Sequence, residues 1–232
     1  MNTITILFIV TSQALLGNTG EPTGVWLEEL TTPYYMFKDA GYEVEIASVQ
    51  GGEIPVDPRS LSDEDKPESV VKFESDEALQ TSLQSSAAAN QVDSSKYAAV
   101  FFPGGHGTMF DFPNNGTLAG VINDVLARDG VVAAVCHGPA ALVGVNGPDG
   151  EPIVKGKKVS VFTDAEEEAV GLTDEMPFAL ESKLAELGAE IISAENWAPQ
   201  AVRDGNLVTG QNPASSAEVA RLVLEALSEK AN

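Results

Sequence analysis

The chain has a single cysteine, and its surroundings favour chemistry. Cys136 ends the apolar run VVAAV and is followed at once by His137 and Gly138. A cysteine at a sharp turn from a buried strand into a helix projects its thiol into the cleft above a sheet. The free N–H groups at the start of that helix favour the thiolate, which is the reactive form. The sequence therefore predicts a nucleophile at Cys136, against the alternative of a buried cysteine that only packs.

A second glycine-lined turn follows another apolar strand, in the sequence FFPGGHG. The backbone N–H groups of Gly104, Gly105 and His106 in this turn can face the thiol and stabilise an oxyanion. His106 and His137 are the only histidines in the chain, so either of them can be the base. Two histidines and one cysteine do not supply the usual ligand set of a zinc site, and we expect no metal.

Two groups of carboxylates can complete such a site. Glu28 and Glu29 lie in the otherwise apolar segment VWLEEL, and one that points inward can exchange a proton with the thiol. The run Glu166, Glu167 and Glu168 follows the predicted strand KKVSVFT, where one carboxylate can reach a histidine and orient it. Charged side chains are ordinarily solvated, so the residues alone leave open which carboxylate of each group does this.

The scaffold for these residues is predicted from alternating strands and helices. Apolar or alternating patterns predict strands at 4–10, 42–48, 97–105, 130–135, 157–163 and 189–195, and a hairpin at 201–210. Helices are expected at 23–41, 67–92, 118–128, 177–188 and 213–230. This order predicts one α/β domain over residues 1–232 with a doubly wound, mostly parallel sheet, in which sites lie beyond the carboxyl ends of strands. Residues 50–90 are expected to form a surface excursion, with 50–66 as a polar loop.

Composition excludes several classes of protein. The net charge of −22 comes from 13 Lys and Arg against 35 Asp and Glu, and it argues against binding to nucleic acid. The N-terminal apolar segment 4–10 is too short to span a bilayer and lacks the flanks of a signal peptide. A lone cysteine forms no internal disulfide. We therefore expect a cytoplasmic protein without a membrane anchor.

Five segments, in order and over nearly the whole chain, resemble the ThiJ/PfpI superfamily with its class I glutamine-amidotransferase-like fold. The resemblance is to the branch of heat-inducible chaperones and glutathione-independent glyoxalases (glyoxalase III). The matching segments are TGVWLEEL (23–30), FFPGGHGTMFDFP (101–113), VVAAVCHGPAAL (131–142), GKKVSVFTDAEEEAVG (156–171) and LVTGQNPASS (207–216). Residues 50–90 differ, because they are shorter and lack the tryptophan-containing loop of the fungal glyoxalases.

The resemblance implies a flavodoxin-like fold with helices on both faces of the sheet, a homodimer and no cofactor. It matches Cys136 to the reactive cysteine, His137 to its neighbouring histidine and Glu29 to the proton-transferring glutamate. The acid that orients the histidine falls at Glu167, with a doubt of one residue within the run of three. The oxyanion amides fall in the turn at Gly105 and at the elbow, where Gly138 lets the backbone approach closely.

The activity that the resemblance implies is conversion of a small 2-oxoaldehyde, methylglyoxal or glyoxal, to lactate or glycolate through a hemithioacetal on Cys136. Two alternatives use the same fold: a stress holdase that captures unfolding proteins, and a protein deglycase or redox sensor that uses the thiol. No histidine follows His137, which argues against release of ammonia from glutamine.

Overall fold

The computed structural model describes residues 4–62 and 66–230, built around one seven-stranded sheet. The strands lie in the order β3 (Ala87–Ala88), β2 (Glu43–Ser48), β1 (Thr5–Val10), β4 (Tyr97–Phe102), β5 (Val131–Val135), β9 (Leu207–Gly210) and β8 (Ala201–Asp204). Each neighbouring pair is parallel except β8 and β9, which form an antiparallel hairpin. The predicted doubly wound, mostly parallel sheet with a small hairpin is confirmed.

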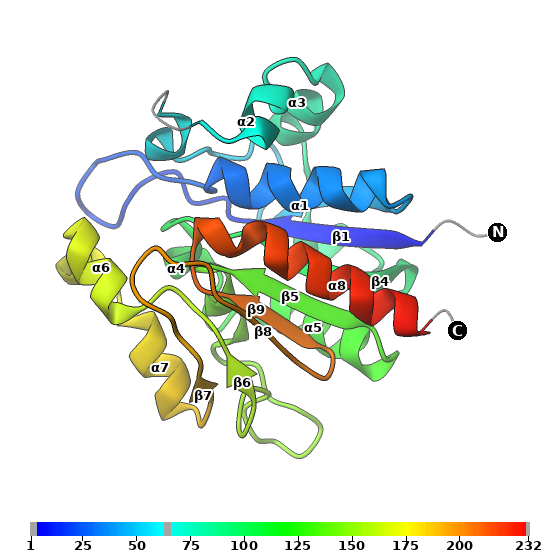
Figure 1. Ribbon diagram of the computed structural model, residues 1–232, viewed down its shortest axis with the longest axis vertical. Helices are drawn as coiled ribbons and strands as arrows, with labels where there is room; N and C mark the ends of the chain where they lie inside the picture. Colours follow the sequence, from blue (N-terminus) through cyan, green and yellow to red (C-terminus); the bar gives the residue numbers. More distant parts are fainter. Residues whose placement is uncertain (1–3, 63–65, 231–232) are drawn as a thin grey trace.

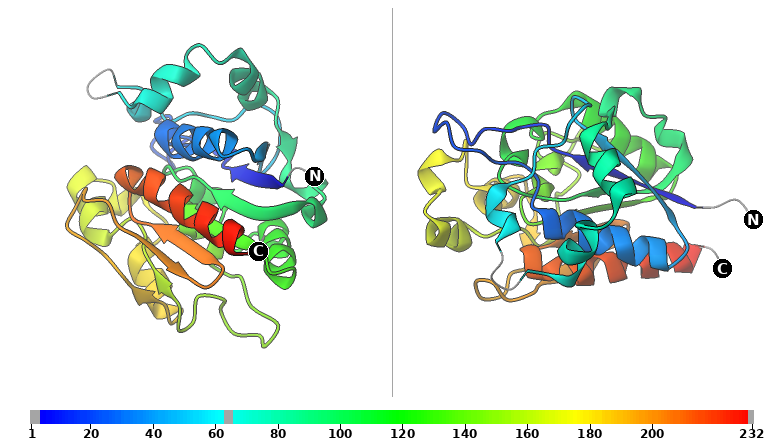
Figure 2. Two further views of the ribbon diagram at one scale, coloured as in Figure 1. Left: turned by 45° about the vertical axis from the view of Figure 1, so that its right-hand side comes forward. Right: turned by 90° about the horizontal axis from the view of Figure 1, so that it is seen from above.

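Helices cover both faces of this sheet (Figure 1). Helices α1 (Leu27–Asp39) and α8 (Ser216–Lys230) pack side by side on one face, and α5 (Gly116–Ala127) lies on the other, as the view from above shows (Figure 2). The shorter helices are α2 (Glu68–Phe73), α3 (Glu77–Gln84), α4 (Thr108–Asp111), α6 (Asp164–Val170) and α7 (Leu180–Glu186). None of the helices in the described part of the chain is long and apolar enough to cross a membrane.

The two apolar cores follow from the alternation of side chains along the strands. In β1, Phe8 faces α1 and α8, where its ring stacks on Phe101 at 4.8 Å and meets Phe37 edge-on at 5.9 Å. Leu7 and Ile9 point to the opposite core, beneath α5. A parallel sheet covered on both faces requires such continuous apolar strands. This is why the run at 4–10 is apolar throughout.

The order of the strands places a crevice at the carboxyl edge of the sheet. The chain adds β2 and β3 on one side of β1 and then crosses over to place β4 on the other side. Loops that leave β1 and β4 therefore diverge, and ligands of such sheets bind at this topological switch point. Both predicted chemical segments, the glycine turn after β4 and Cys136 after β5, lie at this edge.

The helical stretch predicted over 67–92 is present up to Gln84 but is divided into two short helices. Helix α2 ends at Phe73, and Asp76 starts α3 by accepting a hydrogen bond from the Leu79 amide at 2.9 Å. After α3, Ala87–Ala88 joins the sheet as the short edge strand β3. A side-chain cap in the middle of a helix-favouring stretch thus divides it into separate elements.

The strands predicted at 157–163 and 189–195 are much shorter than expected. Only β6 (Lys158–Val159) and β7 (Glu190–Ile191) pair, in a separate two-stranded sheet. Beyond β6 the backbone turns to the elbow instead, where Ser160 N–H donates to Thr209 Oγ1 at 2.8 Å and Phe162 N–H donates to the Cys136 carbonyl at 3.0 Å. The apolar residues after β6 are therefore extended, but they hydrogen-bond to Thr209 and to the Cys136 turn instead of forming a longer strand.

The predicted helix at 23–41 begins only at Leu27, because the preceding residues hold the polar segment at 50–62 in place. Val25 N–H donates to the Pro55 carbonyl at 2.9 Å, and Val25 pairs with Val56 as a parallel bridge. Asp57 is completely buried. Most residues of this segment are exposed, as in a surface loop, but Ile54, Asp57 and Ser60 are buried. The segment packs against the residues before α1 and places Arg59 in the lining of the pocket.

We predict that Gly24→Ala will lower the free energy of unfolding by about 1–3 kcal/mol, as overpacking does. The added Cβ would lie 2.1 Å from the Pro55 carbonyl oxygen. The matched control is Gly120→Ala in α5, where a Cβ meets no atom within 4 Å and helix propensity improves by about 1 kcal/mol. Urea unfolding measures both. Equal stability of the two variants would contradict close packing at Gly24.

Candidate active site

Cys136 lies in a strained turn that its neighbours hold in place. Its φ of 61° is in the left-handed region, which a residue with a side chain adopts at a free-energy cost. Its N–H donates to the Gly210 carbonyl at 2.9 Å, and its carbonyl accepts from Phe162. Gly138 lies behind the turn, where a Cβ would come within 2.1 Å of the Phe102 carbonyl oxygen. The elbow therefore needs glycine at 138 and aims the thiol away from β5.

The thiol meets the imidazole of its sequence neighbour. Cys136 Sγ lies 3.3 Å from His137 Nδ1, and His137 Nε2 lies 2.6 Å from Glu167 Oε2. An ionised carboxylate only accepts hydrogen bonds, so Nε2 carries the proton and the lone pair of Nδ1 faces the sulfur. The turn is thus tight enough for the adjacent residue to point at the thiol. The three side chains form a thiol–imidazole–carboxylate chain like that of cysteine hydrolases.

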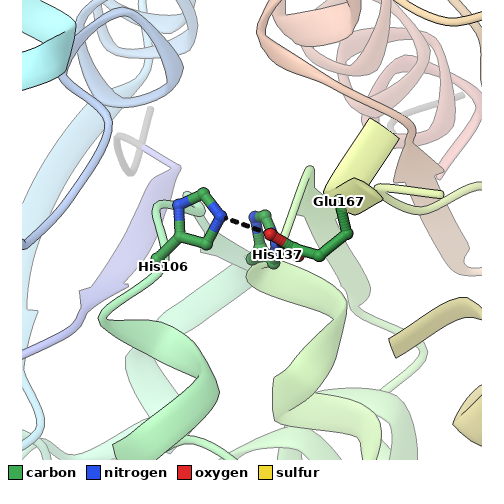
Figure 3. A group of neighbouring side chains, drawn as sticks. All are labelled: His106, His137 and Glu167. Carbon is green, nitrogen blue, oxygen red and sulfur yellow. Dashed lines mark hydrogen bonds and ion pairs between the residues drawn. The ribbon is translucent and has the colours of Figure 1, made fainter. Parts of the chain in front are cut away.

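The other histidine shares the same carboxylate. His106 Nε2 donates to Glu167 Oε1 at 2.8 Å, so one carboxylate holds both imidazoles (Figure 3). Burial acts to raise the pKa of Glu167, but the hydrogen bonds from His106 and His137 outweigh it and leave that pKa well below its usual range. Burial and the nearby His137 lower the pKa of His106 to about 4. At neutral pH, Glu167 is therefore charged and His106 is neutral.

Glu29 reaches the site from the first turn of α1. Its side chain is completely buried, and Oε2 accepts a hydrogen bond from the Gly104 amide at 2.7 Å. Within the described chain Oε1 has no hydrogen-bond partner. Burial raises the pKa of Glu29 and also that of Cys136. The carboxyl is near enough to Cys136 for each group to act on the other: Cys136 acts to lower the pKa of Glu29, and Glu29 acts to raise the pKa of Cys136. The two groups are therefore coupled through one proton, as two buried acids in contact must be.

Two backbone amides are free to hold an oxyanion. The N–H groups of Gly105 and His137 donate to no backbone or side-chain oxygen among residues 4–62 and 66–230. Gly105 has a φ of +104°, and a Cβ there would lie 2.2 Å from the Gly24 carbonyl oxygen. The Gly104 carbonyl accepts from Trp26 N–H at 3.1 Å, which joins the turn to the start of α1. Neighbouring backbone atoms lie so close to Gly104 and Gly105 that both positions require glycine.

The three consecutive glutamates of α6 have different surroundings. Glu167 faces the histidines, whereas Glu168 is exposed. Glu166 is completely buried and accepts hydrogen bonds from Trp197 N–H at 2.9 Å, Asn212 Nδ2 at 2.9 Å and Thr163 N–H at 3.0 Å. Thr163 caps the helix and fixes its rotational phase. Adjacent helical residues point about 100° apart. Glu166 therefore hydrogen-bonds three separate segments of the chain, whereas Glu167 hydrogen-bonds the two histidines.

A pocket of about 400 Å³ opens above the thiol. Its polar side comprises Arg59, His106, Cys136 and His137, and its apolar walls are formed by Trp26, Phe162, Val170, Trp197 and Pro213. Arg59 was not predicted, because it lies in a polar segment without periodicity. Trp26 and Trp197 were not predicted either, although they are the only tryptophans of the chain and both line the pocket. The rarity of tryptophan in this chain was the one sequence feature that could have indicated these two pocket residues.

His106, His137 and Glu167 could in principle offer three ligands to a metal, since their nitrogen and oxygen atoms lie within 4.8 Å of one another. Both Nε2 atoms, however, already donate to Glu167. The guanidinium of Arg59 lies 3.1 Å from His106 Nδ1, so a cation would bind beside a positive charge. These residues fit a hydrogen-bonded catalytic group better than a resident metal.

We predict opposite effects of two neighbouring substitutions in α6. Glu167→Gln places amide hydrogens against an imidazole N–H and should slow alkylation of Cys136 by iodoacetamide about 10- to 100-fold, as expected for a positioned base. Glu166→Gln should leave alkylation within a few-fold but lower the free energy of unfolding by about 1–3 kcal/mol, because buried donors lose their acceptor. If Glu166→Gln were the variant with the slower thiol, these assignments would be reversed.

We predict that Glu29→Gln will stabilise the protein increasingly as the pH rises. Burial raises the folded-state pKa of Glu29 above its ordinary value of 4.5, which holds in the unfolded chain. Between these two values the folded state binds more protons than the unfolded state, so the wild type loses stability as the pH rises. Glutamine has no such loss, and the gap should widen by about 1.4 kcal/mol per unit of pKa difference. Urea unfolding between pH 5 and pH 9 measures it, and a gap independent of pH would contradict the raised pKa.

Comparison with known proteins confirms the resemblance seen in the sequence. Residues 22–226 match the DJ-1/PfpI family. The chain is 36% identical to glyoxalase 3 of Candida albicans over 89% of this chain and 91% of the relative, and 34% identical to a glutathione-independent glyoxalase of Schizosaccharomyces pombe over 90% of each. The crystal structure of Rapid Encystment Protein 24 kDa from Francisella tularensis superposes with a TM-score of 0.93 at 41% identity, covering 97% of this chain and 99% of that one. The chain therefore belongs to the DJ-1/PfpI family.

Proposed function

We propose that this protein is a glutathione-independent glyoxalase that converts 2-oxoaldehydes such as methylglyoxal to 2-hydroxy acids. The observation that carries the proposal is the completely buried carboxyl of Glu29, with Oε1 unpartnered, close to the Cys136 thiol that lines the pocket. A nucleophile and a proton-transferring acid must both reach the two carbons of such a substrate. Relatives named as glutathione-independent glyoxalases support the same activity.

The reaction starts with attack of the thiol on the aldehyde carbon. His137 Nδ1, 3.3 Å from Sγ, takes the thiol proton as the carbon–sulfur bond forms. The aldehyde oxygen becomes an alkoxide, which the free amides of Gly105 and His137 stabilise. Glu167 stabilises the imidazolium, which then protonates the alkoxide to give a neutral hemithioacetal.

Glu29 then moves a proton between the two substrate carbons. Its carboxylate removes the hydrogen from the former aldehyde carbon, giving an enediolate, and returns that proton to the adjacent carbon, while the hydroxyl proton of the former aldehyde passes to the former ketone oxygen. Burial raises the pKa of Glu29, which makes the ionised carboxyl a stronger base for this step. The aldehyde carbon is thereby oxidised to a thioester and the ketone carbon is reduced to an alcohol. The electrons balance within the substrate, so no external oxidant or cofactor takes part.

Hydrolysis completes the cycle. Water adds to the thioester carbonyl, the carbon–sulfur bond breaks, and the hydroxy acid leaves while Cys136 regains its proton. The net reaction adds one water to methylglyoxal and gives lactate. The apolar walls of Trp26, Phe162 and Trp197 keep bulk water from the enediolate. The homodimer implied by the resemblance and the cytoplasmic location stay predictions.

Lactate formation from methylglyoxal without glutathione tests the proposal. We expect the wild type to form lactate and Cys136→Ala to form none. Glu29→Gln should keep a thiol that iodoacetamide alkylates but lose about 10²- to 10⁴-fold in turnover, the range for a missing general acid–base. Glu28→Gln, next to it and only half-buried, is the matched control and should turn over normally.

The lactate assay also shows which results would contradict the proposal. Chiral analysis of D- and L-lactate reports the face on which the proton returns. Lactate from Cys136→Ala at the wild-type rate would exclude the thiol mechanism. The absence of lactate from the folded wild type would exclude the glyoxalase itself.

A further inference from the structure

Arg59 and His106 are the two polar side chains of the pocket to which the mechanism above gives no task. Arg59 Nη2 lies 3.1 Å from His106 Nδ1, on the side of the imidazole opposite Glu167. We propose that Arg59, held by Asp57, is a positioning residue that fixes the tautomer of His106 and, through Glu167, keeps His137 aimed at the thiol. The inference deepens the glyoxalase proposal and rests on it only for turnover.

Asp57 gives Arg59 a fixed orientation. The guanidinium donates from Nε to Oδ1 at 2.9 Å and from Nη2 to Oδ2 at 2.6 Å, and Thr23 Oγ1 donates to Oδ2 at 2.9 Å. Burial acts to raise the pKa of Asp57, but the hydrogen bonds and charge of Arg59 outweigh it, so the pKa lies below its ordinary value. A forked arginine–carboxylate pair with a buried acid leaves the guanidinium little freedom to rotate.

The fixed guanidinium determines which nitrogen of His106 carries the proton. A guanidinium only donates hydrogen bonds, so Nδ1 of His106 must accept and is without hydrogen. The single proton of the neutral ring is then on Nε2 and points at Glu167 Oε1, 2.8 Å away. Oε2 of Glu167 is left for His137. An unbroken series of hydrogen bonds thus runs from Asp57 to the thiol.

Loss of Arg59 would free His106 to adopt other proton states. With the proton on Nδ1, the lone pair of Nε2 would face the Glu167 carboxylate and repel it. With protons on both nitrogens, His106 would compete with His137 for the charge of Glu167. The groups that face His106 are Arg59 from the 50–62 segment, Glu167 from α6 and His137 from the elbow, and Arg59 is one of the charges that lower the pKa of His106, after burial and His137.

Alkylation of Cys136, the only thiol in the chain, measures the effect without any turnover. In Arg59→Met, Nδ1 of His106 loses its donor, so the ring can take the tautomer whose Nε2 lone pair repels Glu167, and His137 is then held less firmly at the thiol. We expect alkylation by iodoacetamide to fall about tenfold, the factor that corresponds to about 1.4 kcal/mol. Arg203→Met is the matched control, because Arg203 makes a similar forked ion pair with Glu229 on the surface.

Ring nitrogen NMR tests the tautomer directly. The chain has two histidines, so untagged protein gives two ring systems, which a His106→Asn variant assigns. The wild type should show His106 with hydrogen on Nε2 and a bare Nδ1, and Arg59→Met should show hydrogen on Nδ1 as well. Arg59→Lys should restore the wild-type pattern in part, since an ammonium also only donates.

Three results would overturn the proposal. One is wild-type ring signals and a wild-type alkylation profile in Arg59→Met. Another is slower alkylation by the same factor at every pH with unchanged ring signals, which would assign Arg59 to packing or general charge. The third is equal behaviour of the Met and Lys variants. Each readout is independent of methylglyoxal, so absence of lactate would exclude the glyoxalase without affecting this inference.

Discussion

The site depends on one carboxylate that is shared between two imidazoles. Glu167 accepts one N–H on each oxygen, from His106 and from His137. Because each oxygen of the carboxylate accepts one of these bonds, the carboxylate cannot rotate without losing a hydrogen bond, and the ring of His137 is held with Nδ1 at the thiol. Its low pKa keeps the charge in place across the neutral range. The thiol–imidazole–carboxylate arrangement thus requires three elements to meet: the turn after β4, the elbow after β5 and the start of α6.

The doubly wound sheet explains why these elements meet. Parallel strands place all their carboxyl ends at one edge, and the reversal of strand order at β1 and β4 opens that edge. The thiol is set there by backbone strain, since Cys136 has a φ of 61° that hydrogen bonds to Gly210 and Phe162 maintain. The residues after β6 leave the sheet to make the second of these bonds. Stability of the scaffold and geometry of the nucleophile are therefore coupled at the elbow.

Sequence reasoning reached the fold and the sharp turn at Cys136 because both follow from local patterns. An apolar strand, a small-residue turn and a lone cysteine point to Cys136 without any knowledge of distant contacts. The choice of Glu167 within its run depends on the phase of α6, which Thr163 sets through a cap that only the structure reveals. Arg59 was missed because the conformation of a polar segment without periodicity depends on its packing, here against Gly24 and Val25. Helix propensity misled at 67–92, where the cap at Asp76 overrides it.

Four buried carboxylates lie near the pocket, and they differ in their hydrogen-bond partners. Asp57 is paired with a guanidinium, Glu166 accepts backbone and amide donors, and Glu167 accepts two imidazoles. Glu29 differs, because its Oε1 is the one buried side-chain nitrogen or oxygen in the described residues that has no nitrogen or oxygen partner. An unsatisfied buried polar atom destabilises the fold and persists where function requires it. Glu29 is also close enough to Cys136 to act on its pKa, so the least satisfied acid of the site is the one free to exchange protons beside the thiol.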